Sequence, residues 1–358
     1  MRQQILNSSL FTLYSQMKLS VIVPVYGVEK YIERCATSLF NQTLDSIEFI
    51  FVDDCTPDRS MELLQTVIAH HSSLITSRSW TVTIDRMPKN SGLPAVRRHG
   101  LQMATGEYVI HCDSDDWVEP DMFRLMYEKA EAEQADIVVC DYRVSDGEHV
   151  IRSMKGCQPP PTGGGGWGLK ETFINDLLRQ KYAWTVWNKL FRRTACYKEP
   201  FTYPKAPMGE DLVIVLQCLL NGGKMAYLPQ TLYNYFYNPD SICHVDSDEK
   251  LMSIYQQFKA NTDIVVDLFS PHSSLAAANS SLFTYHSSLI TYHSSLFTLK
   301  WYAKKGLWSM PYDRQRRKMF FEAYSEINKR VLFCKDITLR DKVKYVLAYL
   351  GLFPKKAS

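Results

Sequence analysis

Several features that mark particular classes of protein are missing from this sequence of 358 residues. No window contains the roughly 18 continuous apolar residues of a membrane-spanning helix. The nine cysteines form no C-x-x-C pair, and no His/Cys spacing suits a zinc site. A formal net charge of +3 is too small to indicate nucleic-acid binding. The odd number of cysteines and the lack of a signal peptide favour reduced thiols and a cytoplasmic protein.

The composition is that of a soluble globular protein, with 46% hydrophobic and 22% charged residues. At this length we expect two domains, or one large domain with a tail. Short apolar strands alternate with amphipathic helices over the first part of the chain, which predicts a doubly wound α/β sheet. The predicted strands are 19–25, 47–52, 80–84, 108–112 and 137–142.

A short repeat of the form H/N-S-S-L interrupts this pattern. It occurs once near residue 7, once at 71–76, and four times between 272 and 299. Because it is dispersed and rich in poor helix formers, we interpret it as low-complexity insertion into an older framework. The segments 71–79 and 271–299 are then expected to be loops or variable helical extensions, and their histidines are not expected to bind metal.

Three carboxylates, Asp113, Asp115 and Asp116, directly follow the predicted strand 108–112. In open α/β sheets, ligands bind at the carboxyl ends of strands, and crowded carboxylates repel one another unless a cation neutralises them. One or two carboxylates plus substrate phosphates usually hold Mg²⁺, and oxygen ligands also suit Mn²⁺. The cluster therefore predicts a metal–diphosphate site, and the alternative is an acidic turn that caps the next helix.

Six motifs occur in order at plausible spacings: V-I-V-P-V-Y-G, F-V-D-D-C-T-P-D, N-S-G-L-P-A-V-R-R-H-G, D-S-D-D-W-V, W-N-K-L-F and G-E-D-L. Together they resemble family 2 glycosyltransferases of the GT-A fold, in particular bacterial enzymes of surface-polysaccharide assembly. The resemblance covers about residues 17–245. It implies a GT-A doubly wound mixed sheet, a UDP-sugar or similar donor, a divalent cation, and inverting hexosyl transfer to a hydroxyl of a glycan or lipid-linked acceptor.

The chain is accordingly expected to have four parts. These are an extension 1–16, a nucleotide-sugar-binding α/β domain 17–145, an acceptor-side part 146–245, and a helical C-terminal region 246–358 with the repeat insertion 271–299. The tail 343–353 is amphipathic and is followed by two lysines. It is a candidate for peripheral contact with the inner face of the cell membrane, and the alternative is a solvated helix packed on the domain.

The resemblance implies a nucleotide site at the ends of the first two strands. Pro24, Val25 and Tyr26 match the segment that lines the nucleobase, where Tyr26 would stack unless it is a core residue. Asp53 and Asp54 match the acids that accept the base N–H. A base with one imide donor needs one such acceptor, and we favour Asp53.

The third motif matches the loop that approaches the nucleotide. Asn90 and Gly92 would let the backbone come close, where a side chain would obstruct. Arg97 matches the arginine that faces the diphosphate as a fixed charge. The family usually has Asn at the next position, and Arg98 stands there in this chain, which leaves open which arginine faces inward.

The acids match two further elements of the family. Asp115 would be the main metal ligand, Asp113 would reach the ribose or a metal-bound water, and Asp116 is the third candidate. Asp211 matches the catalytic base, because an inverting transfer needs a carboxylate on the face opposite the leaving nucleotide. Glu210 and Asp211 could also be acids favoured by a helix N-terminus.

Trp187 and Lys189, from the W-N-K-L-F motif, are expected with Glu210 on the acceptor side, although Trp187 could equally belong to the core. Two rival functions remain. A nucleotidyltransferase would favour a Gly- and Lys/Arg-rich phosphate loop after the first strand, which V-P-V-Y-G-V-E lacks, and an inactive homologue would bind nucleotide sugar without turnover. The donor sugar, acceptor and linkage depend on loop shapes that the motifs do not specify.

Overall fold

The computed structural model describes residues 17–158, 169–178, 181–238 and 248–268, with single positions at 339, 342, 343 and 346. The extension 1–16, the repeat insertion 271–299 and most of the predicted tail therefore lie outside the described residues. The chain divides into two compact units, one of residues 1–177 and 182–244, the other of residues 178–181 and 245–358. The second unit contains helix α9 (Asp248–Leu268).

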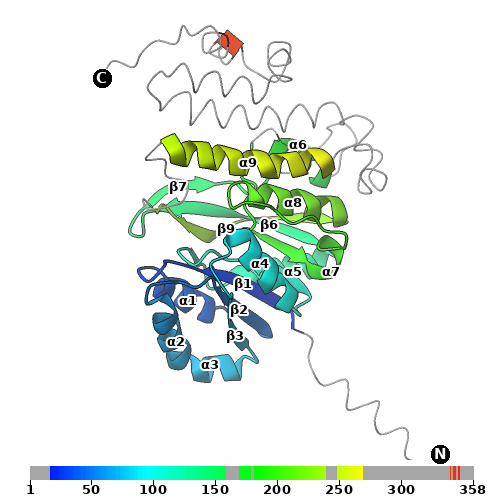
Figure 1. The fold of residues 1–358 in the computed structure, drawn as a ribbon. Helices are drawn as coiled ribbons and strands as arrows, with labels where there is room; N and C mark the ends of the chain where they lie inside the picture. The colour runs from blue at the N-terminus through cyan, green and yellow to red at the C-terminus, as the bar shows by residue number, and fades with distance from the viewer. Residues whose placement is uncertain are drawn as a thin grey trace, which may run out of the picture. The chain divides into compact units, whose positions relative to one another are not determined.

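The first unit is built on a mixed sheet of nine strands (Figure 1). Its strands are β1 (Leu19–Val25), β2 (Ile47–Asp53), β3 (Thr81–Arg86), β4 (Tyr108–His111), β5 (Trp117–Val118), β6 (Ile137–Ser145), β7 (Val150–Met154), β8 (Lys189–Arg192) and β9 (Met225–Phe236). Their order is β3-β2-β1-β4-β8-β6-β9-β5, with β7 paired to β6. Strands β3, β2, β1 and β4 are parallel, and β8 joins them to the rest by antiparallel pairing with β4 and β6.

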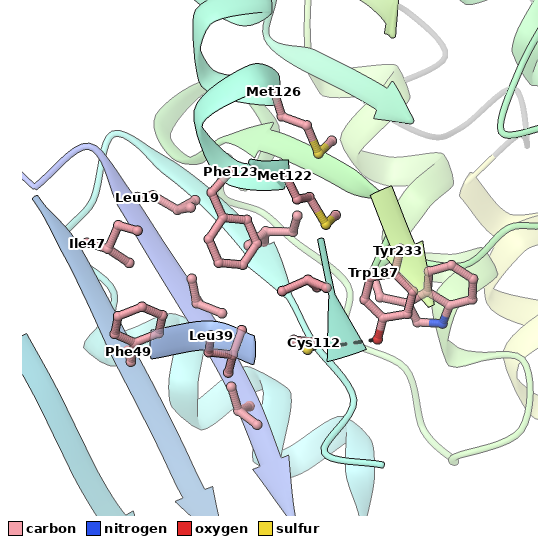
Figure 2. Close-up of a cluster of buried hydrophobic side chains, with 14 of the residues drawn as sticks. Leu19, Leu39, Ile47, Phe49, Cys112, Met122, Phe123, Met126, Trp187 and Tyr233 are labelled. Atoms are coloured by element: carbon pink, nitrogen blue, oxygen red, sulfur yellow. Dashed lines mark hydrogen bonds between the residues drawn. The ribbon is translucent and has the colours of Figure 1, made fainter. Parts of the chain in front are cut away.

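Helices pack on both faces of β1, with α1 and α5 on one side and α4 on the other. The described helices outside α9 are α1 (Ile32–Phe40), α2 (Ser60–His70), α3 (Ser72–Ser77), α4 (Leu93–Met103), α5 (Met122–Glu133), α6 (Leu169–Leu178), α7 (Arg193–Cys196) and α8 (Glu210–Asn221). Alternate strand residues point to opposite faces. Leu19 belongs to the core shared with Leu39 of α1 and Phe123 of α5 (Figure 2), whereas Ile22 packs with Val96 of α4.

The structure differs from the predicted elements mainly where strands are short. Strand β5 has two residues between acids, and β7 and β8 have five and four, so none offers enough periodicity to be recognised. Helix α5 follows β5 and begins at Met122. In the segment 71–79, α3 continues directly after α2, which is the helical form of the two forms expected.

Glu48 fastens the loop that delivers β4 to the sheet. Its carboxylate accepts hydrogen bonds from Ser20 Oγ (2.5 Å), from the Thr105 N–H (2.5 Å) and from the Gly106 N–H (2.8 Å). A Cβ at Gly106 would lie 2.6 Å from the Ser20 backbone nitrogen, so only glycine fits there. This buried acid in the run I-E-F-I-F-V, which the sequence analysis did not single out, joins β1, β2 and the start of β4.

We expect Glu48→Ala to lower the free energy of unfolding by about 2–4 kcal/mol, because several buried donors lose their acceptor at once. Urea unfolding measures the change. The control is Glu128→Ala, which removes an exposed i,i+4 pair with Arg124 and should cost less than about 0.5 kcal/mol. Equal effects of the two substitutions would contradict the role given to Glu48.

Candidate active site

The acidic loop after β4 is held from behind by β9. Asp116 is fully buried, and its two oxygens accept from the Tyr233 hydroxyl (2.6 Å) and the Phe236 N–H (2.7 Å). The same Tyr233 hydroxyl accepts from the Asp113 N–H (3.1 Å). Burial raises the pKa of Asp116 well above its usual value, and the charges of Asp115 and Asp113 add to this. Both carboxylate oxygens of Asp116, which is predicted as a third metal ligand, are thus bonded to β9, and these bonds tie the loop to the core.

Asp113 and Asp115 remain partly open to solvent, unlike Asp116. The side chain of Asp113 is 28% exposed, and its Oδ1 pairs with Arg97 Nη2 at 2.5 Å. Burial raises the pKa of Asp113 to about 6, because Arg97 offsets only part of the effect and Asp211 and Asp115 reinforce it. Burial also raises the pKa of Asp115, whose Oδ2 accepts from Asn238 at 3.3 Å.

Arg97 lies at the centre of the acids. Its side chain is 2% exposed, and its Nη2 binds Asp113 while its Nη1 binds Asp211 Oδ1 (2.6 Å) and pairs with Glu210. Burial alone would lower the pKa of Arg97, but the charges of Asp113 and Asp211 raise it above its usual value. Between the two arginines that the motif left open, Arg97 faces inward, and Arg98 is exposed with its guanidinium over the Tyr203 ring (4.4 Å).

Helix α8 brings the second set of acids to this point. Gly209, with φ of +81°, precedes the helix, and Glu210 and Asp211 form its first turn. The helix-terminus alternative is thus realised, because acids are stabilised there by the dipole. It coexists with the pairing to Arg97: Glu210 is 2% exposed and Asp211 is 18% exposed. Only Asp211 is accessible enough to meet a substrate directly.

The residues predicted for the nucleotide lie along the neighbouring edge of the sheet. Asp54 accepts from the Ser91 N–H (2.7 Å) and the Gly92 N–H (2.8 Å), so its carboxylate shapes the loop before α4. Gly92 has φ of +79°, a conformation that favours glycine. Asp53 accepts from the Thr56 N–H (2.7 Å) and lies 3.4 Å from Arg86. Both acids are buried, and the choice of Asp53 over Asp54 as the acid that binds a base stays a prediction.

The end of β1 presents a tyrosine to solvent. Tyr26 is 51% exposed, which excludes the core alternative, and it follows the buried strand residues Pro24 and Val25. Asn90, in the facing loop, is also exposed. Both side chains are therefore open to solvent.

A polar clamp that the sequence analysis missed fixes the turn after Tyr26. Asp58 Oδ2 accepts from the Glu29 N–H (3.0 Å), and its Oδ1 accepts from the Thr56 and Ser60 hydroxyls. Thr56 Oγ1 in turn accepts from the Gly27 N–H (2.8 Å). From sequence, Asp58 and Ser60 look like helix caps, and only the fold shows that they reach back to the β1 turn.

The W-N-K-L-F motif lies beneath the site and not on its surface. Trp187 is 3% exposed and stacks on Tyr233 with ring centroids 4.3 Å apart (Figure 2), so the core alternative describes its position. Lys189 is fully buried and donates to the Thr185 carbonyl (2.6 Å) and to Asn188 Oδ1 (2.8 Å). Burial lowers the pKa of Lys189 to about 7, although the charge of Asp211 opposes the shift.

The donor set fits a divalent cation shared with substrate phosphates. Among the described residues, no group of three or more His, Cys, Asp and Glu is placed to hold a metal by itself. Mg²⁺ sites that include substrate phosphates need only one or two carboxylates. Asp115 and Asp113 would supply these, and burial raises the pKa of both carboxyl groups, with a further contribution from the charges of Asp211 and Asp115 at Asp113.

A cavity of about 420 Å³ opens beside the acidic loop, away from the predicted site residues. It is lined by Glu33, Arg34, Thr37, Ser38, Asn41, Val118 and Pro120. Arg34 links it to the site, because its Nη2 donates to the Asp115 carbonyl at 2.7 Å.

The sequence profile described as "Glycosyl transferase family 2" matches residues 20–200. The chain belongs to this family, which confirms the family predicted from the motifs. It is 30% identical over 246 residues to the "Uncharacterized glycosyltransferase EpsJ" of Bacillus subtilis, covering 66% of this chain and 67% of that protein. It is 27% identical over 225 residues to "Poly(ribitol-phosphate) beta-N-acetylglucosaminyltransferase TarS" of Staphylococcus aureus, covering 61% of this chain. The chain spans 67% of EpsJ but only 35% of TarS.

Solved structures confirm the predicted mixed α/β fold of the GT-A type. S. aureus TarS 1-349 in complex with UDP-GlcNAc superimposes with a TM-score of 0.63, covering 94% of this chain and 88% of that one, at 16% identity. A second crystal structure of TarS 1-349 superimposes with a TM-score of 0.60. In the described part of this chain, no helix is long and apolar enough to cross a membrane.

The buried ammonium of Lys189 predicts a pH effect on stability. Its folded-state pKa of about 7 lies below its ordinary value of 10.5, so the unfolded chain binds more protons between these two values. Stability should therefore rise with pH above 7, by at most about 1.4 kcal/mol per pH unit from this group. Urea unfolding at several pH values from 7 to 9 should show a steeper rise for the wild type than for Lys189→Met, and parallel profiles would contradict the prediction.

Proposed function

We propose that this chain is an inverting glycosyltransferase of polysaccharide biosynthesis. It moves a sugar from a nucleotide-diphosphate donor, in the first instance a UDP-sugar, to a hydroxyl of a glycan or lipid-linked acceptor. The observation that carries the proposal is the pairing of Arg97 with both Asp113 and Asp211. The same guanidinium thus contacts Asp113, the acid proposed to lie near the donor phosphates, and Asp211, the acid needed on the acceptor side.

The roles follow the motifs that this chain shares with the family. Tyr26 and Asp53 bind the nucleobase, and the loop at Gly92 approaches the nucleotide. Asp115, with Asp113, would hold Mn²⁺ or Mg²⁺ together with the diphosphate, and a bound cation would stabilise the charge on the leaving group. The choice of a UDP-sugar is supported by the TarS structures, in which that protein is in complex with UDP-GlcNAc or with UDP.

Asp211 is the base in this proposal. Its carboxylate is held by Arg97 at the start of a rigid helix, while 18% of its side chain remains exposed. There it takes the proton of the acceptor hydroxyl as the hydroxyl oxygen attacks the sugar carbon from the face opposite the diphosphate. Glu210 and Lys189 belong to the acceptor side of the site but are buried. Neither side chain can therefore contact an acceptor directly.

A peripheral contact between the tail 343–353 and the inner face of the cell membrane stays part of the proposal, with the protein on the cytoplasmic side. Most of that segment lies outside the described residues. The relatives named above also extend beyond the length that this chain matches, so acceptor and linkage are left to experiment.

Incubation with a panel of UDP-sugars and Mn²⁺ tests the activity through release of UDP. We expect Asp211→Asn to lower that release by about 10²–10⁴-fold, the usual contribution of a positioned base, without weakening UDP binding. The matched control is Asp121→Asn, which alters an acid at the start of α5 that binds Thr43 and Arg124 and should leave turnover unchanged.

Each rival function gives a different result in this assay. UDP binding without release with any sugar would indicate the inactive homologue. Formation of a nucleotide sugar from a nucleoside triphosphate and a sugar phosphate, with release of pyrophosphate, would indicate a nucleotidyltransferase. Normal turnover by Asp211→Asn would remove Asp211 as the base while leaving the transferase assignment in place.

A further inference from the structure

Arg34 reaches the acidic loop from helix α1, outside every motif that predicted the site. Its guanidinium carbon lies 4.0 Å from the centre of the Trp117 ring and 4.6 Å from that of Phe236. Its Nη2 donates a 2.7 Å hydrogen bond to the carbonyl of Asp115. The cation is therefore stacked against two aromatic rings while it holds the peptide of the residue predicted to bind metal.

The surroundings of Arg34 are built closely around it. Gly147, in the turn between β6 and β7, has φ of +104°, and a Cβ there would come within 3.2 Å of Arg34 Nη1. Burying a guanidinium is costly unless its charge and donors are compensated. Here the ring faces and the Asp115 carbonyl provide part of that compensation, while Arg34 Nε is buried without a hydrogen-bond partner. Burial lowers the pKa of Arg34, and the negative charges of Asp116 and Asp115 oppose this shift.

The contacts of the acidic loop hold Asp115 from two sides. Tyr233 and Phe236 hold the neighbouring Asp116 and the Asp113 N–H from the β9 side. Asn238 Nδ2 donates to Asp115 Oδ2 (3.3 Å), and Arg34 fixes the Asp115 carbonyl from the α1 side. Arg34 therefore fixes the backbone from which the Asp115 side chain projects.

The geometry points to Arg34 as a positioning residue that aims the Asp115 carboxylate at a divalent cation bound with the donor diphosphate. This inference rests on the function proposed above and adds a residue to it. Arginine suits the position because its planar group can stack on a ring and donate in its own plane at once. Lysine, a compact charge on a flexible stem, cannot do both.

The test compares Arg34→Lys with a matched substitution elsewhere in the same unit. Arg78 also donates to a backbone carbonyl, that of Thr43 (2.9 Å), and lies 5.9 Å from the Trp80 ring, but it is remote from the acidic loop. Titration calorimetry gives the Kd for UDP with Mn²⁺ and again with EDTA for wild type, Arg34→Lys and Arg78→Lys. Electron paramagnetic resonance of free Mn²⁺ follows metal binding independently of turnover.

Arg34→Lys should weaken UDP binding in Mn²⁺ by about 10-fold or more, as is usual when a residue that orients a metal ligand is changed. Its Kd in EDTA should match that of the wild type, and Arg78→Lys should match the wild type in both conditions. An undiminished effect of Mn²⁺ in Arg34→Lys, or an equal loss with and without the metal, overturns the inference. The response of the wild type to Mn²⁺ reports on the proposed function. If Mn²⁺ does not tighten UDP binding by the wild type, both the proposed metal-dependent function and the role of Arg34 are contradicted.

If Arg34→Lys does not fold, Phe236→Leu carries the same test. It removes one ring from Arg34 but keeps the backbone N–H that binds Asp116. The expected result is again a loss confined to the Mn²⁺ condition, smaller than for Arg34→Lys. An unchanged Kd in Mn²⁺ for this variant would overturn the inference.

Discussion

One buried cation organises this site. The Arg97 guanidinium is surrounded by the carboxylates of Asp113, Glu210 and Asp211, which come from a loop after β4 and from the first turn of α8. Each charge depends on its partners, because removing one partner from a buried ion pair typically costs about 3–5 kcal/mol of folding stability. Together they fix two elements that are about a hundred residues apart in the chain.

The contact with Arg97 both fixes the positions of Asp113 and Asp211 and places a positive charge beside their carboxyl groups. Arg97 binds Asp211 at a helix N-terminus, and it binds Asp113 in the same loop as the partly exposed Asp115. His111, which precedes this loop, is also buried, and burial together with the charge of Arg97 lowers its pKa well below the usual value. A neutral imidazole there adds no second positive charge next to Arg97, so the acids keep a single dominant cation.

The sequence was sufficient for the long parallel strands and for the acids, because apolar runs ending in carboxylates mark the edge of such a sheet. It could not distinguish Asp116 from its neighbours, since that depends on Tyr233, more than a hundred residues later. Glu48 was missed because one acid in an apolar strand resembles the exposed face of that strand. The two-residue strand β5 and the role of Arg34 required the fold, since neither has a periodic or motif signal. The sequence was equally consistent with Trp187 on the acceptor side and with Trp187 in the core, and the structure places it in the core.

The most direct test of the central claim is a double-mutant cycle between Arg97 and Glu210, read as free energies of unfolding in urea. Arg97→Met leaves the buried acids without their cation, and Glu210→Gln removes one of those acids. If the contact organises the site, the double variant should be more stable than the sum of the single effects predicts, by about 1 kcal/mol or more. Additive effects within about 0.5 kcal/mol would show that these groups do not interact as described and would contradict the account.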